Sequence, residues 1–285
     1  SNHKSGANRG MSKAGQATGM KGSENSLRQK SLLQRDVDKG GKLVKRDFQL
    51  IAGLTLVYAI IALLNLGSLK APETFWKPVN AGENFYVSLG SKQVIQKVNS
   101  YGAPGDGSFK VEFSDDLQNW HDTQTIEREG SVFVWKSLNV SVSAKYVKVI
   151  VEKPGFRLSE MALYGPNSEK PLTIEAVVPN NKTRLTNDNR PSFVFDEQDQ
   201  AAFEVTYMNG TYFDEIYHAR TAFEHLNRIE PYESTHPPLG KIIIGWGTLI
   251  FGMNPFGWRI MGTLFGIAMI PILYAFAKLL FRRTE

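Results

Sequence analysis

The chain has 285 residues, of which 42% are hydrophobic, with no cysteine and a formal net charge of +5 at neutral pH. The lack of cysteine excludes disulfide support and thiol chemistry. Much of the positive excess precedes the first long apolar run, which favours contact with anionic lipid headgroups and gives no sign of a nucleic-acid partner. Because the apolar residues are concentrated in a few segments, their distribution defines the class of protein better than their total.

Residues 1–47 are rich in Gly, Ser, Lys, Asn and Gln and contain hardly an aromatic side chain. This composition predicts a disordered basic tail. The next run, residues 48–69, carries no charge over 22 residues, about the length of a helix that crosses a hydrocarbon core of roughly 30 Å. Because it follows a long polar segment, we interpret it as a retained transmembrane anchor and not as a cleaved signal peptide.

Residues 256–283 form the second predicted span, in which Pro271 is expected to kink the helix. Basic pairs flank the two spans, Lys45-Arg46 before the first and Arg282-Arg283 after the second. The positive-inside rule therefore predicts a multi-pass plasma-membrane protein with a cytoplasmic N-terminus and an extracytoplasmic region between the spans. The alternative, two buried helices of a soluble protein, is disfavoured because neither run has a polar face.

Residues 71–165 contain short alternating stretches separated by turn clusters. This pattern predicts an antiparallel β-sandwich. Its inward-facing set is expected to include Phe109, Val111, Phe113, Val147, Val149 and Val151. Three turn residues, Asp106, Asp115 and Asp116, could hold a structural calcium ion, although such residues are also common turn formers.

The ordered motifs of this region resemble the discoidin-type (coagulation-factor C-type) jelly-roll module. They are Trp76, YVSLG, VIQKVNSYG, FKVEFSDDLQNW, VFVWKSL, AKYVKVIV and LSEMALYG. The resemblance implies a module that binds glycans or lipid headgroups through loops at one end; a spacer is the alternative. The polar segment that follows, residues 166–210, is predicted to be a linker.

The tripeptide Phe-Asp-Glu occurs twice, with its acidic pairs at Asp196-Glu197 and Asp214-Glu215. No helical apolar pattern directly follows the first pair, which predicts a solvated loop. After the second pair, apolar residues recur at three- and four-residue spacings: Ile216, Ala219, Phe223 and Leu226. This spacing predicts a helix with both acidic residues in its first turn.

The second acidic pair has a structural and a functional interpretation. Asp214 could cap the helix and Glu215 could interact with the helix dipole. However, Asp214 and His218 are four residues apart and share one helix face, which places a carboxylate beside an imidazole.

Residues 211–255 combine this acidic helix with the element THPPLGK, which contains His236 and Lys241. The apolar run that follows is too short to span a bilayer and predicts an interfacial or re-entrant helix. Arg259 stands at the outer end of the second span, where it could extend to the headgroups or contact a phosphate. Such a set suits transfer from a lipid-linked phosphate donor, which needs a base for the nucleophile and cations for the leaving phosphate.

The motifs FDEIYHARTAFEHL and THPPLGKIIIGWGTLIFGMNPFGWRIMGTLFGI together resemble the first extracytoplasmic loop and second membrane helix of the protein O-mannosyltransferase family. These are dolichyl-phosphate-mannose-dependent C-type glycosyltransferases. The resemblance implies an α-helical membrane protein, present here as its N-terminal part with two transmembrane helices. An all-β jelly-roll sandwich is then inserted in the first extracytoplasmic loop.

The resemblance also implies roles for individual residues. Asp214 would be the general base, and Glu215 would help to position the acceptor. The residues that bind the donor phosphate or the substrate would be His218, His236, Lys241 and Arg259. The implied reaction is an inverting transfer of mannose from a polyprenyl-phosphate donor to a protein Ser or Thr hydroxyl, without an obligatory metal ion.

Two alternatives remain open. The acceptor could be a lipid or a cell-wall glycan, or the chain could be a membrane-anchored glycan- or lipid-binding module in which the acidic helix is only structural. Members of the family contain more spans than the two found here. The chain is therefore expected to be the N-terminal part of an enzyme and inactive on its own.

Overall fold

The structure is a computed structural model that describes residues 42–281. Most of the predicted tail and the basic pair Arg282-Arg283 lie outside the described residues. The chain divides into two compact units. The first unit, as described, contains residues 42–61 and 266–281, and the second contains residues 62–265.

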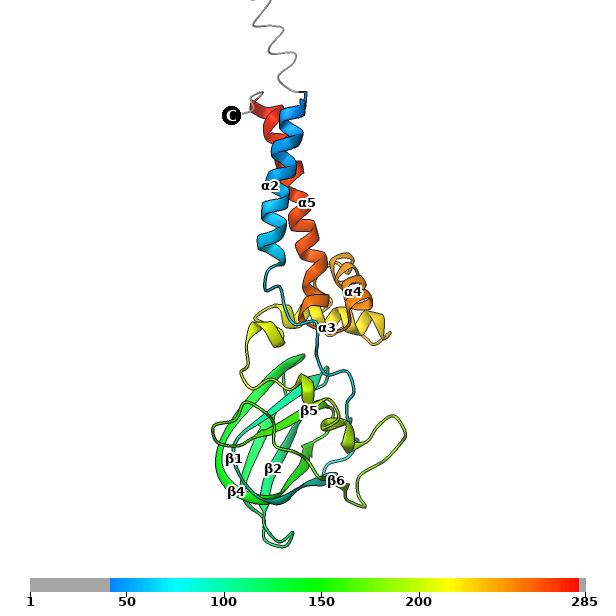
Figure 1. Cartoon of the computed structure of the whole chain (residues 1–285). Coiled ribbons are helices and arrows are strands. Elements are labelled where there is room, and N and C mark those ends of the chain that lie inside the picture. Colours follow the sequence, from blue (N-terminus) through cyan, green and yellow to red (C-terminus); the bar gives the residue numbers. More distant parts are fainter. Residues whose placement is uncertain (1–41, 282–285) are drawn as a thin grey trace, which may run out of the picture. The chain divides into compact units, whose positions relative to one another are not determined.

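The first unit contains most of helix α2 (Lys45–Leu63) and the second half of helix α5 (Pro255–Phe281). These segments lie side by side (Figure 1). In the described part of the chain, α2 and α5 are the two helices long and apolar enough to cross a membrane, with mean hydropathies of 1.5 and 2.1. Only 6% of each apolar window is buried, so the helices expose apolar surface as lipid-facing helices do.

A polar cluster joins the two helices of the first unit. Asp47 in the first turn of α2 is fully buried and accepts a hydrogen bond of 2.8 Å from the Tyr274 hydroxyl. Its other carboxylate oxygen lies 3.5 Å from Lys278 Nζ. The predicted first span, residues 48–69, is longer than the observed helix, which ends at Leu63 shortly before Asn65 adopts a left-handed φ of 53°.

The second unit is built around six strands in the described residues, here called the β-domain. They are β1 (Asn84–Ala103), β2 (Ser108–Ser114), β3 (His121–Glu127), β4 (Val134–Lys153), β5 (Arg157–Tyr164) and β6 (Ala176–Pro179). All pairings are antiparallel, in the order β3-β2-β4-β1-β5, with β6 also paired to β1. The strands form one curved hydrogen-bonded sheet and not two separate ones, because β1 and β4 each run for 20 residues (Figure 1).

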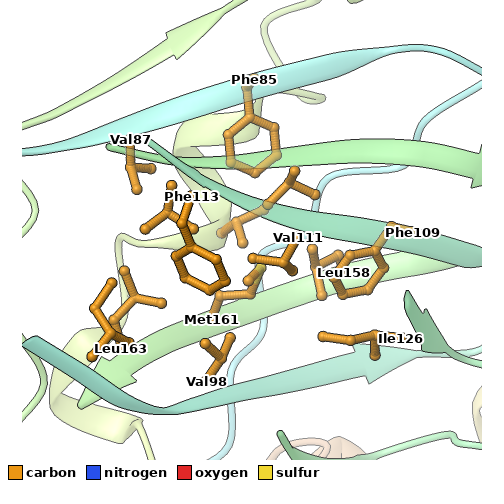
Figure 2. Close-up of a cluster of buried hydrophobic side chains, with 14 of the residues drawn as sticks. Phe85, Val87, Val98, Phe109, Val111, Phe113, Ile126, Leu158, Met161 and Leu163 are labelled. Atoms are coloured by element: carbon orange, nitrogen blue, oxygen red, sulfur yellow. The ribbon is translucent and has the colours of Figure 1, made fainter. Parts of the chain in front are cut away.

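The sheet encloses one hydrophobic core, part of which Figure 2 shows. The six side chains predicted to face inward on β2 and β4 are each at most 2% exposed, which confirms the alternating pattern. Trp76 packs edge-on against Phe85 with ring centroids 5.1 Å apart. Full burial of such side chains contributes on the order of 2 kcal/mol each.

The structure corrects the predicted linker at residues 166–210. Within it, β6 pairs with β1, and Val194 of η1 (Pro191–Val194) lies in the core of the β-domain. Two further 3₁₀ turns follow, η2 (Gln198–Gln200) and η3 (Tyr207–Asn209). A few apolar side chains within a polar composition are therefore enough to fix this segment on the sheet.

Helices α3 (Glu215–Leu226) and α4 (Leu239–Phe251) pack against each other, and Gly245 of α4 faces Leu226 of α3. The apolar side chains that α4 leaves exposed are Leu239, Ile242, Trp246, Leu249, Ile250 and Phe251. A short apolar helix that exposes this many apolar side chains suits a membrane surface, and the interfacial position of α4 stays a prediction.

Candidate active site

The acidic pair at the start of α3 has an unusual backbone. Phe213 immediately precedes it with a left-handed φ of 51°, a conformation that bulky residues rarely adopt. Asp214 occupies the N-cap position, but its side chain makes no capping hydrogen bond. Among the described residues its exposed carboxylate has no hydrogen-bond partner. Capping therefore does not explain the Asp214 side chain.

Glu215 forms a forked ion pair with Arg259 in the first turn of α5. The Arg259 Nε and Nη2 atoms lie 2.7 and 2.6 Å from the two carboxylate oxygens. Arg259 also donates to the carbonyl oxygens of Leu66 and Gly210, at 2.9 and 3.1 Å. These four bonds use four of the five N–H donors of the guanidinium, so its charge is largely neutralised by Glu215.

His218 lies one turn after Asp214, and its ring centroid is 6.4 Å from that of His236. Burial lowers the pKa of His218, and the neighbouring Lys241 and His236 lower it further, against a smaller opposing effect of Asp214 and Glu215. The imidazole is therefore neutral at neutral pH. The structure thus brings the two predicted histidines together at one end of α3.

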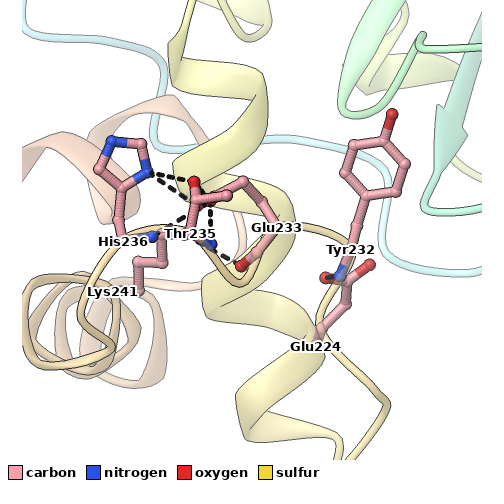
Figure 3. A network of polar contacts seen from close by, with 6 residues as sticks. All are labelled: Glu224, Tyr232, Glu233, Thr235, His236 and Lys241. Carbon is pink, nitrogen blue, oxygen red and sulfur yellow. Dashed lines mark hydrogen bonds and ion pairs between the residues drawn. The ribbon is translucent and has the colours of Figure 1, made fainter.

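Glu233 holds the loop that carries His236, as Figure 3 shows. Its carboxylate accepts hydrogen bonds from the backbone N–H groups of Thr235 and His236, at 2.6 and 3.2 Å, and lies 3.1 Å from His236 Nδ1. It also pairs with Lys241, whose Nζ donates to the Glu233 carbonyl at 3.2 Å. Lys241 is only 3% exposed, so its charge holds this loop in place.

Glu224 anchors the same loop to α3 (Figure 3). The buried carboxylate accepts hydrogen bonds from Arg220 Nε at 2.9 Å and from the Tyr232 backbone N–H at 2.8 Å. Arg220 also stacks over the Tyr232 ring at 3.9 Å. The sequence analysis missed Glu224 and Glu233. The i,i+4 spacing of Arg220 and Glu224 was a signal for one of them, whereas Glu233 meets His236 and Lys241 through the fold of a loop, which helical spacing does not predict.

The β-domain packs directly on this site through Phe133. The Phe133 ring lies between those of Phe223 in α3 and Trp258 in α5, with centroid distances of 5.6 and 5.9 Å. The Thr211 N–H donates to the Phe133 carbonyl at 2.8 Å, and the Thr211 hydroxyl donates to the Val132 carbonyl at 2.8 Å. The segment that leads into the acidic pair is thereby fixed to the β-domain.

Two cavities share the Glu215–Arg259 pair. The larger has a volume of about 890 Å³ and extends towards Val134 of the β-domain. The smaller, of about 400 Å³, includes His218 and Trp258. Both volumes are in the range of small-molecule sites, and the pair borders both spaces.

The first acidic pair has a different environment, and the predicted solvated loop is wrong for Glu197. Its carboxylate accepts hydrogen bonds from the backbone N–H groups of Glu73 and Thr74 at 2.9 and 3.0 Å. Asp196 is exposed and accepts one from the Thr74 hydroxyl at 2.8 Å. This pair therefore holds the segment before β1 against the β-domain.

A third carboxylate, Glu160 of β5, is buried beside this pair. Ligand atoms of Glu160, Asp196 and Glu197 all lie within 4.8 Å of one another, and carboxylate oxygens at such spacing could hold a hard cation. Burial raises the pKa of Glu160 to about 9, despite hydrogen bonds from the Gln198 side chain and the Glu197 backbone N–H. Without a cation, Glu160 is protonated at neutral pH.

The three aspartates that were predicted as possible calcium ligands each contact a different partner. Asp106 accepts from the Gly130 N–H at 3.1 Å, and Asp115 pairs with Lys92 at 2.5 Å. Asp116 accepts from two backbone N–H groups of its own turn, which lowers its pKa. The turn-forming interpretation accounts for Asp116, and a calcium ion in the β-domain stays a prediction.

No family model matches the chain. Over 78 residues, 25% of its length, it is 35% identical to the polyprenol-phosphate-mannose–protein mannosyltransferase of Mycobacterium tuberculosis (strain H37Rv). Over a stretch of the same length it is 32% identical to the protein of that name from Mycolicibacterium smegmatis (strain MKD8). Both alignments cover 15% of the mycobacterial protein. Part of this chain is thus similar to protein mannosyltransferases, and the chain spans about 15% of their length.

Solved structures match with low scores. A chain described as "CpGH89CBM32-6 produced by Clostridium perfringens" aligns at 16% identity and a TM-score of 0.29, covering 35% of this chain and 82% of its own. The chitosan-binding module 1 of a chitosanase/glucanase from Paenibacillus sp. IK-5 aligns at 22% identity and a TM-score of 0.25, covering 32% and 73%. Scores of this size do not establish a common fold.

Proposed function

We propose that this chain is part of a membrane glycosyltransferase that moves mannose from a polyprenyl-phosphate donor to a protein Ser or Thr hydroxyl at the outer membrane face. The observation that carries the proposal is the Asp214 carboxylate. It is exposed and makes no hydrogen bond to described residues, directly beside the Glu215–Arg259 pair. The mycobacterial relatives are named for a polyprenol-phosphate-mannose donor and a protein acceptor.

In the proposed reaction, Asp214 takes the proton of the acceptor hydroxyl while the hydroxyl oxygen forms a bond to C1 of mannose. The bond between C1 and the phosphate oxygen breaks, and its electron pair leaves with the polyprenyl phosphate. Attack from the opposite face inverts the configuration, so a β-linked donor gives an α-mannoside. An exposed carboxylate is suited to this role because it can reach a hydroxyl without breaking an existing bond.

Glu215 and the four basic residues complete the proposed site. Glu215, fixed by Arg259, positions the acceptor. His218 and the Nε2 side of His236, whose Nδ1 faces Glu233, contact the donor phosphate directly, because Lys241 and Arg259 are paired with Glu233 and Glu215. Lys241 then acts mainly by holding the loop of His236, and Arg259 contributes its remaining N–H donor.

The test, like every transfer assay below, uses membranes that carry the full-length protein of which this chain is proposed to be part, with labelled polyprenyl-phosphate mannose and a Ser peptide with a matched Ala peptide. We expect label on the Ser peptide only, its removal by an α-mannosidase but not a β-mannosidase, and the same rate in EDTA. Label on a glycolipid or glycan but not on peptide would show the wrong acceptor class. No transfer at all would favour a membrane-anchored glycan- or lipid-binding module, for which Asp214 is dispensable.

A further inference from the structure

The larger of the two cavities is bounded by three separate segments of the second unit. The first is the end of the α2 region, the second is Val134 at the start of β4, and the third is the segment before α3. Its wall residues include Leu64, Leu66, Val134, Val205, Tyr207 and Tyr212. The cavity volume of about 890 Å³ is larger than a single monosaccharide requires.

The wall that contains Val134 is rigidly built. Arg128 is 1% exposed and donates to the carbonyl oxygens of Ser131 and Val134, at 2.9 and 3.5 Å. Between them, Phe133 adopts a left-handed φ of 55°. Burial lowers the pKa of Arg128 to about 10, so the guanidinium stays charged and holds this turn at neutral pH.

The opposite wall is tied to the same turn. Gly210 lies so close that a Cβ atom placed there would come 3.1 Å from the Phe133 carbonyl oxygen. The following residue, Thr211, makes the two hydrogen bonds to Val132 and Phe133 already described. The β-domain therefore fixes both the Val134 wall and the segment that carries Tyr207 and Tyr212.

The chemistry of the cavity favours an uncharged ligand. Among the described residues that line it, Glu215 and Arg259 are the charged ones, and their forked pair neutralises both. The rest of the lining is mostly aliphatic or aromatic, with the uncharged polar residues Asn65, Thr206 and Thr211 among it, and Tyr207 and Tyr212 are 50% and 69% exposed. A phosphate would meet little net positive charge here, whereas an apolar side chain would lose water on several sides.

We propose that this cavity binds the polypeptide acceptor, holding a bulky apolar side chain next to the residue that receives the sugar, and that the β-domain thereby sets acceptor preference. The inference rests on the proposed function, in which Asp214 is the base. Glu215 lines the cavity, and Asp214 precedes it in the chain as an exposed residue outside the lining, so a side chain in the cavity would bring the neighbouring hydroxyl near Asp214. The prenyl chain of the donor is the competing occupant.

The kinetic test compares two Ser peptides that differ only in a Leu or a Gly next to the Ser. We expect kcat/KM to be about 10-fold higher for the Leu peptide, the usual scale of selection by an apolar pocket. Val134→Trp fills the cavity and should bring the ratio to about 1, with KM for the donor unchanged. Val94→Trp, at an exposed position of β1, is the control and should keep the ratio.

Tyr207→Ala provides a second variant in case Val134→Trp does not fold. It removes part of the opposite wall and should lower the preference for the Leu peptide without changing KM for the donor. Equal kcat/KM for both peptides in the unsubstituted protein would overturn the inference. A raised donor KM in Val134→Trp would do the same, because it would show that the cavity holds the prenyl chain.

A binding measurement separates this inference from the proposed function. The Leu peptide, with a photoreactive diazirine on the Leu side chain, is irradiated with the full-length protein in lipid nanodiscs, and the cross-links are mapped by mass spectrometry. Cross-links at Val134 and Tyr207 without any mannose transfer would uphold the cavity and reject the transferase. Transfer with cross-links only outside the cavity would reject the cavity and uphold the transferase.

Discussion

The pairs Asp196-Glu197 and Asp214-Glu215 share the tripeptide Phe-Asp-Glu but differ in what their carboxylates bind. In the first pair both side chains accept hydrogen bonds from the segment before β1, and Glu160 lies beside them. In the second pair Glu215 is bound by Arg259, whereas Asp214 has no hydrogen-bond partner among the described residues. A carboxylate that accepts hydrogen bonds from the fold contributes to stability, and an exposed unbonded one is available for proton transfer.

The largest expected effect separates the two aspartates. Asp214→Asn keeps the side-chain size but removes the base, so turnover of mannose transfer should fall by about 10²-fold or more. Asp196→Asn should change turnover less than about twofold, because general-base catalysis does not use it. Steady-state transfer rates in membranes with matched protein levels measure both. Equal losses in the two variants would remove the functional distinction between the pairs.

The two glutamates give the next contrast. Glu215→Ala leaves Arg259 without its forked partner, and loss of one charge-assisted contact should lower transfer by about 10-fold. Glu197→Ala leaves the backbone N–H groups of Glu73 and Thr74 unsatisfied, so it should lower the free energy of unfolding by about 1–3 kcal/mol with turnover unchanged. Transfer rates and thermal unfolding in detergent distinguish them. Normal transfer by Glu215→Ala would exclude Glu215 from acceptor positioning.

Glu160 tests whether the first pair belongs to the stability of the β-domain. Burial raises its pKa to about 9 from 4.5, so the folded state binds the proton more tightly than the unfolded state. The contribution of Glu160 to stability is therefore fully present below pH 4.5, and it is lost as the pH rises through 9. Between pH 6 and 9 the loss should be about 1 kcal/mol or more.

Urea unfolding followed by tryptophan fluorescence, at both pH values and in EDTA, measures this loss. Glu160→Gln cannot ionise and should flatten the decline, whereas Glu112→Gln, a control at the surface pair with Lys148, should not. A decline that persists in Glu160→Gln would show that another group titrates.

The spacing of apolar residues predicted much of the fold, because within one strand or helix this spacing follows which of its own side chains are buried. The inward residues of β2 and β4 and the helix after Asp214 follow from such local patterns. The attachment of residues 166–210 to the β-domain does not follow from a local pattern. Val194 packs in the core against residues that are distant in the sequence. The Glu215–Arg259 pair joins residues 44 positions apart. The local sequence pattern around either residue does not predict this contact.

The smallest expected effect concerns His218 and the pH dependence of the second pair. Burial and the nearby Lys241 and His236 lower the His218 pKa below its usual 6.5. His218 is therefore neutral at neutral pH, and transfer there should not depend on its titration. Only below this lowered pKa is His218 protonated; its charge, one turn from Asp214, then stabilises the Asp214 carboxylate and should reduce transfer by about two- to threefold.

His218→Gln should remove this part of the acid limb and keep the neutral-pH rate within a few-fold. His225→Gln, in the last turn of the same helix, is the matched control and should leave the pH profile unchanged. An acid limb that is the same in all three proteins would mean that His218 does not act on Asp214. The helix face that Asp214 and His218 share would then serve only to bring His218 towards His236.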